Sequence, residues 1–117
     1  MTESTRPPGK TTIAPEVLVT IARLTALSVP GVSRLAATPS EMERFFSRSS
    51  SEGIKISVED ELVYADIYVI LQADVNVRDV SRLIQSQVSR AISEMVGMDV
   101  GKVNVHVEEI DYTLPSS

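Results

Sequence analysis

The chain has no cysteine, no tryptophan and a single histidine among its 117 residues. Without cysteine it can form no disulfide, no thiolate zinc site and no cysteine nucleophile. One histidine cannot supply a typical zinc ligand set, and no Ser-His-Asp arrangement follows from it. The scattered glycines also form no phosphate-binding loop. We therefore predict no catalytic residues, no metal site and no cofactor, and we expect a protein that is not an enzyme.

The charge balance and the hydrophobic runs exclude further classes. The formal net charge is -5, and an acidic domain repels phosphate backbones unless its basic residues cluster, so we expect no nucleic-acid partner. No stretch approaches the roughly 20 apolar residues that cross a bilayer. The start of the chain also has no signal-peptide pattern. We expect a cytoplasmic protein without direct membrane insertion.

The composition that remains is that of one globular domain. Hydrophobic residues make up 43% of the chain, with only two Phe and three Tyr, so the core must be built from Val, Ile, Leu and Met. We predict a disordered lead over residues 1–9, a single domain over 10–112 and a flexible tail over 113–117.

Two amphipathic helices are predicted, over residues 15–28 and 77–96. Pro15 suits the first helical position. Asn76 is expected to cap the second helix with Asp79 three residues later, and Gly97 to end it. The apolar stripes expected to be buried are Val17, Leu18, Ile21, Ala22, Leu24 and Leu27 in the first helix and Val77, Val80, Ile84, Val88, Ala91, Ile92 and Met95 in the second.

Alternating or short apolar runs predict strands over residues 32–36, 54–58, 62–71 and 102–110, with a further short strand over 10–13. Residues 59–61 form an acidic hairpin turn between two of them. The order is (β)-α-β-β-β-α-β. It predicts an α+β two-layer sandwich, in which two helices pack on one face of a small mixed or antiparallel sheet.

Residues 38–53 are too long for an ordinary connection. Ser40 is placed to cap a short helix that carries Phe45 and Phe46. This segment is either a surface loop whose two aromatic rings tuck under the core or a partner-docking element.

Other candidate contacts lie on the predicted sheet and the second helix. Tyr64 and Tyr68 fall on the strand face that is not purely polar, and Arg78, Arg82 and Ser89 fall on the outer side of the helix, which is either a solvated face or a contact surface. His106 is interpreted as an ordinary strand residue, with Glu108 as the acid on the same face. The candidate partner contacts are Phe45, Phe46, Tyr64, Tyr68, Arg78, Arg82 and Ser89.

Two stretches resemble the alkaline shock protein family of bacterial envelope stress response proteins. They are residues 13–32 and 53–110, above all the ending GKVNVHV at 101–107. The resemblance implies a non-enzymatic cytoplasmic protein without a cofactor, which self-associates and lies near the membrane through an anchor protein. The family has no catalytic residues to transfer. Ala14 replaces the expected serine cap, and the 38–53 segment is longer than expected, so the partner can differ.

The leading hypothesis is therefore a structural or interaction protein of the cell envelope that forms homo-oligomers or binds a membrane-anchor protein. The alternative is a nucleic-acid or small-ligand binding module on the exposed sheet face. That module would use Tyr64, Tyr68 and Lys55, and the net charge of the chain argues against it.

Overall fold

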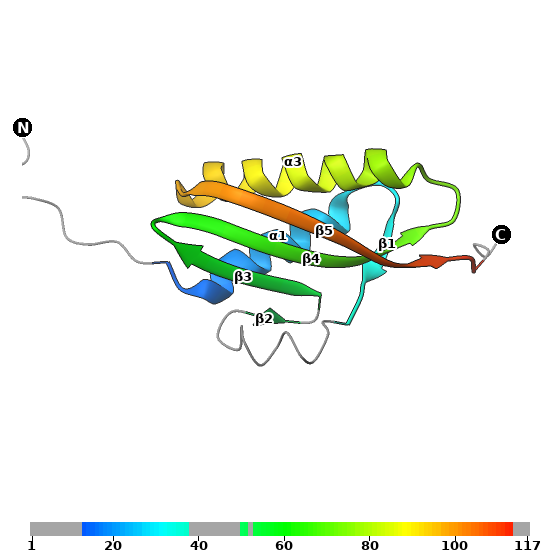
Figure 1. Ribbon diagram of the computed structural model, residues 1–117, viewed down its shortest axis with the longest axis horizontal. Helices are drawn as coiled ribbons and strands as arrows, with labels where there is room; N and C mark the ends of the chain where they lie inside the picture. The colour runs from blue at the N-terminus through cyan, green and yellow to red at the C-terminus, as the bar shows by residue number, and fades with distance from the viewer. Residues whose placement is uncertain (1–12, 38–49, 52, 114–117) are drawn as a thin grey trace, which may run out of the picture.

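The computed structural model describes residues 13–37, 50–51 and 53–113. In chain order the elements are helix α1 (Pro15–Ser28), strands β1 (Val32–Leu35), β2 (Ser50–Ser51), β3 (Ile54–Glu59) and β4 (Leu62–Gln72), helix α3 (Val77–Val96) and strand β5 (Asp99–Asp111) (Figure 1). The predicted α+β order is confirmed, with the two-residue strand β2 added to it.

Strand β4 is the centre of a mixed five-stranded sheet. Strand β5 pairs with it in parallel over its whole length. On its other edge, β3 pairs antiparallel with the first half of β4, and β1 pairs antiparallel with its end. Helices α1 and α3 cover one face of this sheet, which gives the predicted two layers (Figure 1).

The core lies between the helices and the sheet. Five alternate residues of β4 are fully buried, namely Val63, Ala65, Ile67, Val69 and Leu71. They face a buried stripe on α3 made of Val80, Ile84, Val88 and Ile92. The alternation along β4 and the spacing of these four residues were both predicted correctly from the sequence.

The predicted burial was wrong at both helix margins. Val17, Leu24 and Leu27 on α1 and Val77 and Met95 on α3 are exposed, whereas the unpredicted Val19 and Ala26 are buried. Periodicity gives the side of a helix that is apolar, but the width of the buried stripe depends on how many neighbours pack against it. Helix α1 meets the sheet with a narrow face because small residues, Ala22 and Ala26, let it approach closely.

Local signals set the ends of α3 as predicted. The Asn76 side chain accepts a hydrogen bond of 3.0 Å from the Asp79 backbone N–H, and Gly97 ends the helix in the left-handed conformation at φ 74°. Helix α1 begins after Ala14, which makes no side-chain cap. Its first turn therefore lacks one of the hydrogen bonds that α3 has.

The strands β1 and β3 meet on the same edge of β4 at Tyr68. The Tyr68 backbone N–H donates to the Gly53 carbonyl, and the Tyr68 carbonyl accepts from the Ala36 N–H, both at 2.8 Å. Gly53 adopts φ 83°, and a Cβ atom added to it would lie 2.7 Å from Leu35 Cβ and 2.9 Å from the Ala36 oxygen. Only glycine fits this junction without a shift of the backbone.

Two expectations fall outside this description in whole or in part. The predicted 10–13 strand is described only at Ile13, which is not in a strand, and the predicted short helix with Phe45 and Phe46 lies outside the described residues.

Candidate interaction surfaces

The sheet face opposite the helices carries a small polar cluster. Asp66 on β4 accepts through Oδ1 a 3.1 Å hydrogen bond from Asn104 Nδ2, and the same oxygen lies 2.9 Å from His106 Nε2. The His106 ring stacks on Tyr68 with centroids 4.5 Å apart. Parallel pairing produces the cluster, because it sets Asp66 beside Asn104 and Tyr68 beside His106. The acid that orients His106 is therefore Asp66 and not Glu108.

This cluster has the form of a structural network. Burial, together with the charges of Asp66 and Glu108, raises the pKa of Tyr68, so its phenol stays neutral. Among the residues that the structure describes, no hydroxyl group hydrogen-bonds to His106, and no three His, Cys, Asp or Glu side chains gather in a metal-binding group. The arrangement offers an orienting acid and an imidazole, but these residues place no nucleophile beside them.

The predicted contact residues divide between two layers of the molecule. Tyr64 is half-buried with its ring against Gly101, and Tyr68 is only 2% exposed. A partner would therefore reach Tyr64 but not Tyr68 in this conformation. Arg78 and Arg82 are exposed on α3, so solvent and partners reach these two arginines freely.

The other predicted contacts add little to these two groups. Ser89 is half-buried on α3, and it follows Arg78 and Arg82 on the same side of the helix. Phe45 and Phe46 lie outside the described residues. The described tyrosines lie on the open sheet face and the described α3 residues in the helix layer, so the structure does not bring them into one site.

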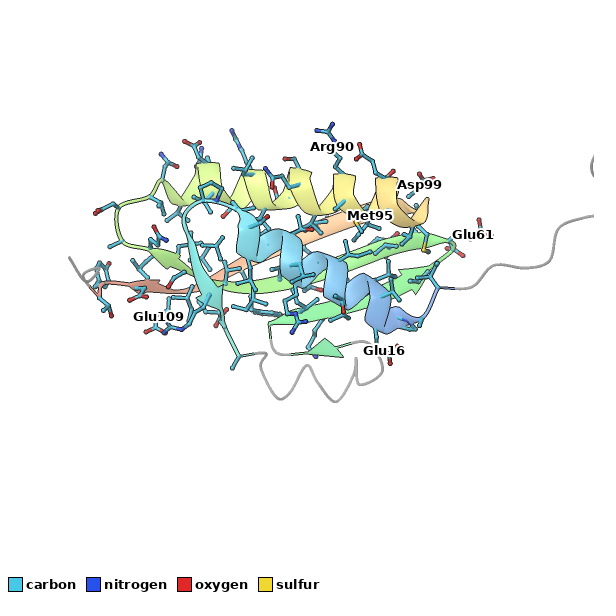
Figure 2. All side chains as sticks on the ribbon, turned by 180° about the vertical axis from the view of Figure 1, so that it is seen from behind. Glu16, Glu61, Arg90, Met95, Asp99 and Glu109 are labelled. Atoms are coloured by element: carbon cyan, nitrogen blue, oxygen red, sulfur yellow. The ribbon has the colours of Figure 1, made fainter. Side chains whose placement is uncertain are left out.

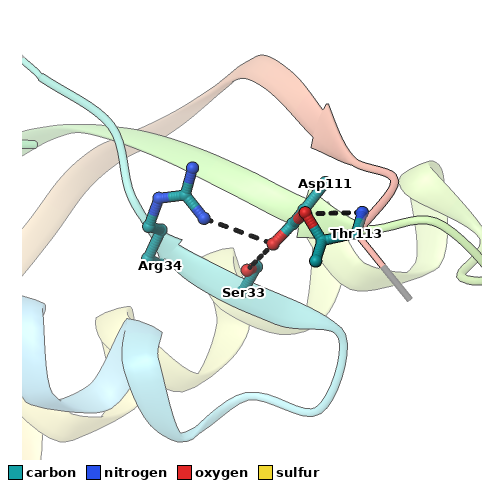
Figure 3. A network of polar contacts seen from close by, with 4 residues as sticks. All are labelled: Ser33, Arg34, Asp111 and Thr113. Atoms are coloured by element: carbon teal, nitrogen blue, oxygen red, sulfur yellow. Dashed lines mark hydrogen bonds and ion pairs between the residues drawn. The ribbon is translucent and has the colours of Figure 1, made fainter. Parts of the chain in front are cut away.

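A second polar cluster fixes the end of β5 to β1 (Figure 3). Asp111 Oδ2 accepts a 2.7 Å hydrogen bond from Ser33 Oγ and lies 3.2 Å from Arg34 Nη1, and Asp111 Oδ1 accepts a 3.0 Å bond from the Thr113 N–H. These hydrogen bonds, that from Ser33 first, lower the pKa of Asp111 to about 2. The cluster joins the two ends of the sheet across β4.

The outer edge of β5 is a feature that the sequence analysis did not single out. In the described part of the chain, β5 pairs only with β4, so its other edge faces outward. Register shifts occur on either side of residues 102–107, which leaves a regular run of six residues between them. Val105 and Val107 in this run are half-buried against the core. The alternating VNVHV pattern was the available signal, but it does not tell an edge strand from a central one.

Helix α3 covers one point of this edge. Gln85 donates from Nε2 to the Val103 carbonyl at 3.1 Å. A helix that caps part of an exposed edge limits where another strand can pair. The part of β5 that remains available therefore lies beyond Val103.

These features define a two-layer α/β domain with an edge strand and no assembled catalytic set among the described residues. The chain belongs to the alkaline shock protein family, described as having a cell envelope-related function, because the family model matches residues 3–112. The family expected from the VNVHV ending and the first helix is thereby confirmed.

Relatives and solved structures agree with this placement. The chain is 36% identical over 103 residues to the uncharacterized protein Spy1535 of Streptococcus pyogenes, covering 87% of this chain and 79% of the relative. It is 26% identical over 106 residues to the uncharacterized protein YqhY of Bacillus subtilis, covering 89% and 78%.

The solved structures share the fold at low sequence identity. The copper form of the MamM CTD has a TM-score of 0.55 at 15% identity and covers 87% of this chain and 96% of its own. The MamM CTD variant H264A has a TM-score of 0.51 at 14% identity, with 82% and 98% covered. Within the described residues, neither helix has the length and hydrophobicity to span a membrane.

Proposed function

We propose that this protein serves the cell envelope as a non-enzymatic structural protein that assembles with copies of itself through the outer edge of β5. The observation that carries the proposal is the six-residue run 102–107, which pairs with β4 on one side only among the described residues. An exposed edge presents backbone N–H and C=O groups to which another strand can bond. Membership of a family with a cell envelope-related function supplies the cellular setting.

The chemistry of β5 favours a specific and limited contact. Val105 and Val107 are half-buried in the monomer, and a second strand beside them would remove more of their surface from water. Lys102, Glu108 and Glu109 are exposed near the two ends of the run, and charges at these places oppose the indefinite addition of strands. We expect a weak, concentration-dependent association, since six residue pairs bury less than a standard interface.

The same edge would accept a strand from a membrane-anchor protein in place of a second copy. The two partners differ in a simple way, because self-association depends on the concentration of this chain alone. A chain that stays monomeric at every concentration would leave only the anchor protein as a partner for β5.

Hydrogen exchange at two protein concentrations tests the proposal without any substitution. We expect backbone amides in residues 104–107 to exchange more slowly in the concentrated sample, because a partner strand protects them. Amides of α3 serve as the internal control and should not change. Association that leaves the β5 amides unchanged would contradict the proposal, as would a chain that sediments as a monomer throughout.

A further inference from the structure

A groove opens at the end of the domain where α1 begins and α3 ends. It has a volume of about 750 Å³, and its walls come from the start of α1, the β3–β4 hairpin and the α3–β5 connection. A shallower depression of about 400 Å³ lies between α1 and α3 and shares Val96 with it. Together they form an elongated channel rather than a closed cavity. In Figure 2 the labelled Met95, Asp99 and Glu61 lie at this end of the molecule.

The lining of the channel is largely apolar. Leu18, Leu62 and Met98 line the larger part, and Ile21 and Val96 the smaller one. Three further apolar side chains are unusually exposed here, which are Val17 at 43%, Val58 at 46% and Met95 at 69%. Contiguous exposed apolar surface of this kind marks a binding site more often than it occurs by chance. Methionine in particular adapts its shape to different apolar partners.

The rim of the channel is acidic. Asp60, Glu61 and Asp99 lie at the larger part and Glu16 at the smaller one, and no lining residue is basic. The neighbouring Arg90 is paired with Glu94 at 2.9 Å and points away from the channel (Figure 2). Asp60 and Glu61 both adopt positive φ, at 52° and 67°. A turn of Asn-Gly would be more comfortable in this hairpin, so the acidic pair costs some stability.

Three occupants fit this surface poorly. Residues 1–12 read MTESTRPPGKTT and hold one large apolar side chain, which is too few to fill an apolar channel. A symmetric second copy would bring two identical acidic rims together, and like charges oppose that contact. An anionic membrane surface would repel the same rim.

We propose that this channel binds an amphipathic helix of a partner protein, whose apolar side chains fill the channel and whose Lys or Arg residues contact the acidic rim. Helices dock into apolar grooves through side chains at i, i+3, i+4 and i+7, and complementary charge fixes their orientation. The inference goes beyond the β5 assembly and does not depend on it, because β5 contributes only Asp99, at its first residue, to the lining.

A designed peptide pair tests the proposal on the full chain. The probe is a helical peptide of about 18 residues with Leu on one face and Lys on the other, and its match carries Glu in place of Lys. We expect titration calorimetry to show about tenfold or tighter preference for the Lys peptide, decreasing as salt is raised. Equal binding of both peptides, or binding of neither, would overturn the proposal.

Two variants locate the binding. Val17→Gln lies in the channel and should weaken the Lys peptide about tenfold, whereas Leu24→Gln, on the same helix and 59% exposed outside the lining, should leave it unchanged. The double change Asp60→Asn and Glu61→Gly should raise the melting temperature and yet weaken the peptide about tenfold, which separates lost binding from lost folding.

Three results would overturn the proposal. The first is equal loss of binding in Val17→Gln and Leu24→Gln, and the second is binding of anionic phosphatidylserine vesicles that competes with the peptide. The third is a dimer of the native chain that Val17→Gln dissolves. Failure of β5 pairing in hydrogen exchange would leave the peptide result unaffected, so the two ideas fail separately.

Discussion

The junction of β1, β3 and β4 at Gly53 gives the most decisive stability prediction. Gly53→Ala would place a Cβ atom 2.7 Å from Leu35 Cβ and 2.9 Å from the Ala36 oxygen, at a φ of 83°. The left-handed conformation costs a residue with a side chain about 1–2 kcal/mol. Overpacking against fixed backbone adds about 1–3 kcal/mol. We expect a total loss of about 2–4 kcal/mol in the free energy of unfolding.

Gly97→Ala is the matched control. Gly97 has nearly the same φ, 74°, but a Cβ atom added there has no neighbour within 4 Å. Its cost is the conformational term alone, reduced by the smaller entropy of the unfolded alanine chain, so we expect about 1 kcal/mol or less. The difference between the two variants isolates the steric term at the junction.

Urea denaturation followed by circular dichroism measures both changes. The slope of the free energy with urea should stay constant while the midpoint falls, since neither variant changes the surface exposed on unfolding. If Gly53→Ala is no more destabilising than Gly97→Ala, then Gly53 is not held between β1 and β4, and the described junction is wrong.

Three further predictions test the core, the caps and the β5 anchor. Ile84→Ala should lower the free energy of unfolding by about 2–5 kcal/mol, whereas Leu24→Ala should change it by less than about 0.5 kcal/mol, because Ile84 is fully buried and Leu24 is exposed; parallel urea titrations check this, and equal losses would contradict the assigned core. Asn76→Ala should cost about 1 kcal/mol and Ala14→Ser should gain about as much, since only the first helix start lacks a cap; thermal melts that shift in the same direction would be inconsistent with it. The lowered pKa of Asp111, about 2 against 3.8 for the free group, means that its stabilising contribution is present above pH 3.8 and is lost as the pH falls through about 2, so Asp111→Asn should flatten the stability profile across that window; an unchanged profile would show that Ser33 does not hold the ionised carboxylate.

Local signals explain why so much of the fold was predictable. The Asn76 cap, the Gly97 stop and the alternation of β4 each depend on a few neighbouring residues, so the sequence determines them directly. The acidic hairpin followed from two apolar runs separated by a short polar turn. The buried residues of α3 followed from the helical period.

The contacts that the sequence could not predict are those between distant residues. His106 was assigned Glu108 as its acid because the two share a strand face, but the parallel register places Asp66 beside it. Val17 and Leu24 were expected in the core because periodicity does not report how closely a neighbour packs. The channel combines two helix ends, a hairpin and the start of β5, and no single stretch of sequence contains that pattern.

The central claim, that β5 pairs with a second copy of this chain, can be tested most directly by cysteine cross-linking, because the natural chain contains no cysteine. Single cysteines would be placed one at a time at Lys102, His106 and Glu109, and at Arg90 on the outer side of α3 as the control. A disulfide forms only between Cα atoms about 4.4–6.8 Å apart. The account predicts covalent dimers at one or two β5 positions near the symmetry axis and none at Arg90. Equal yields at all four positions, or no dimer at any β5 position in a sample that sediments as an oligomer, would contradict it.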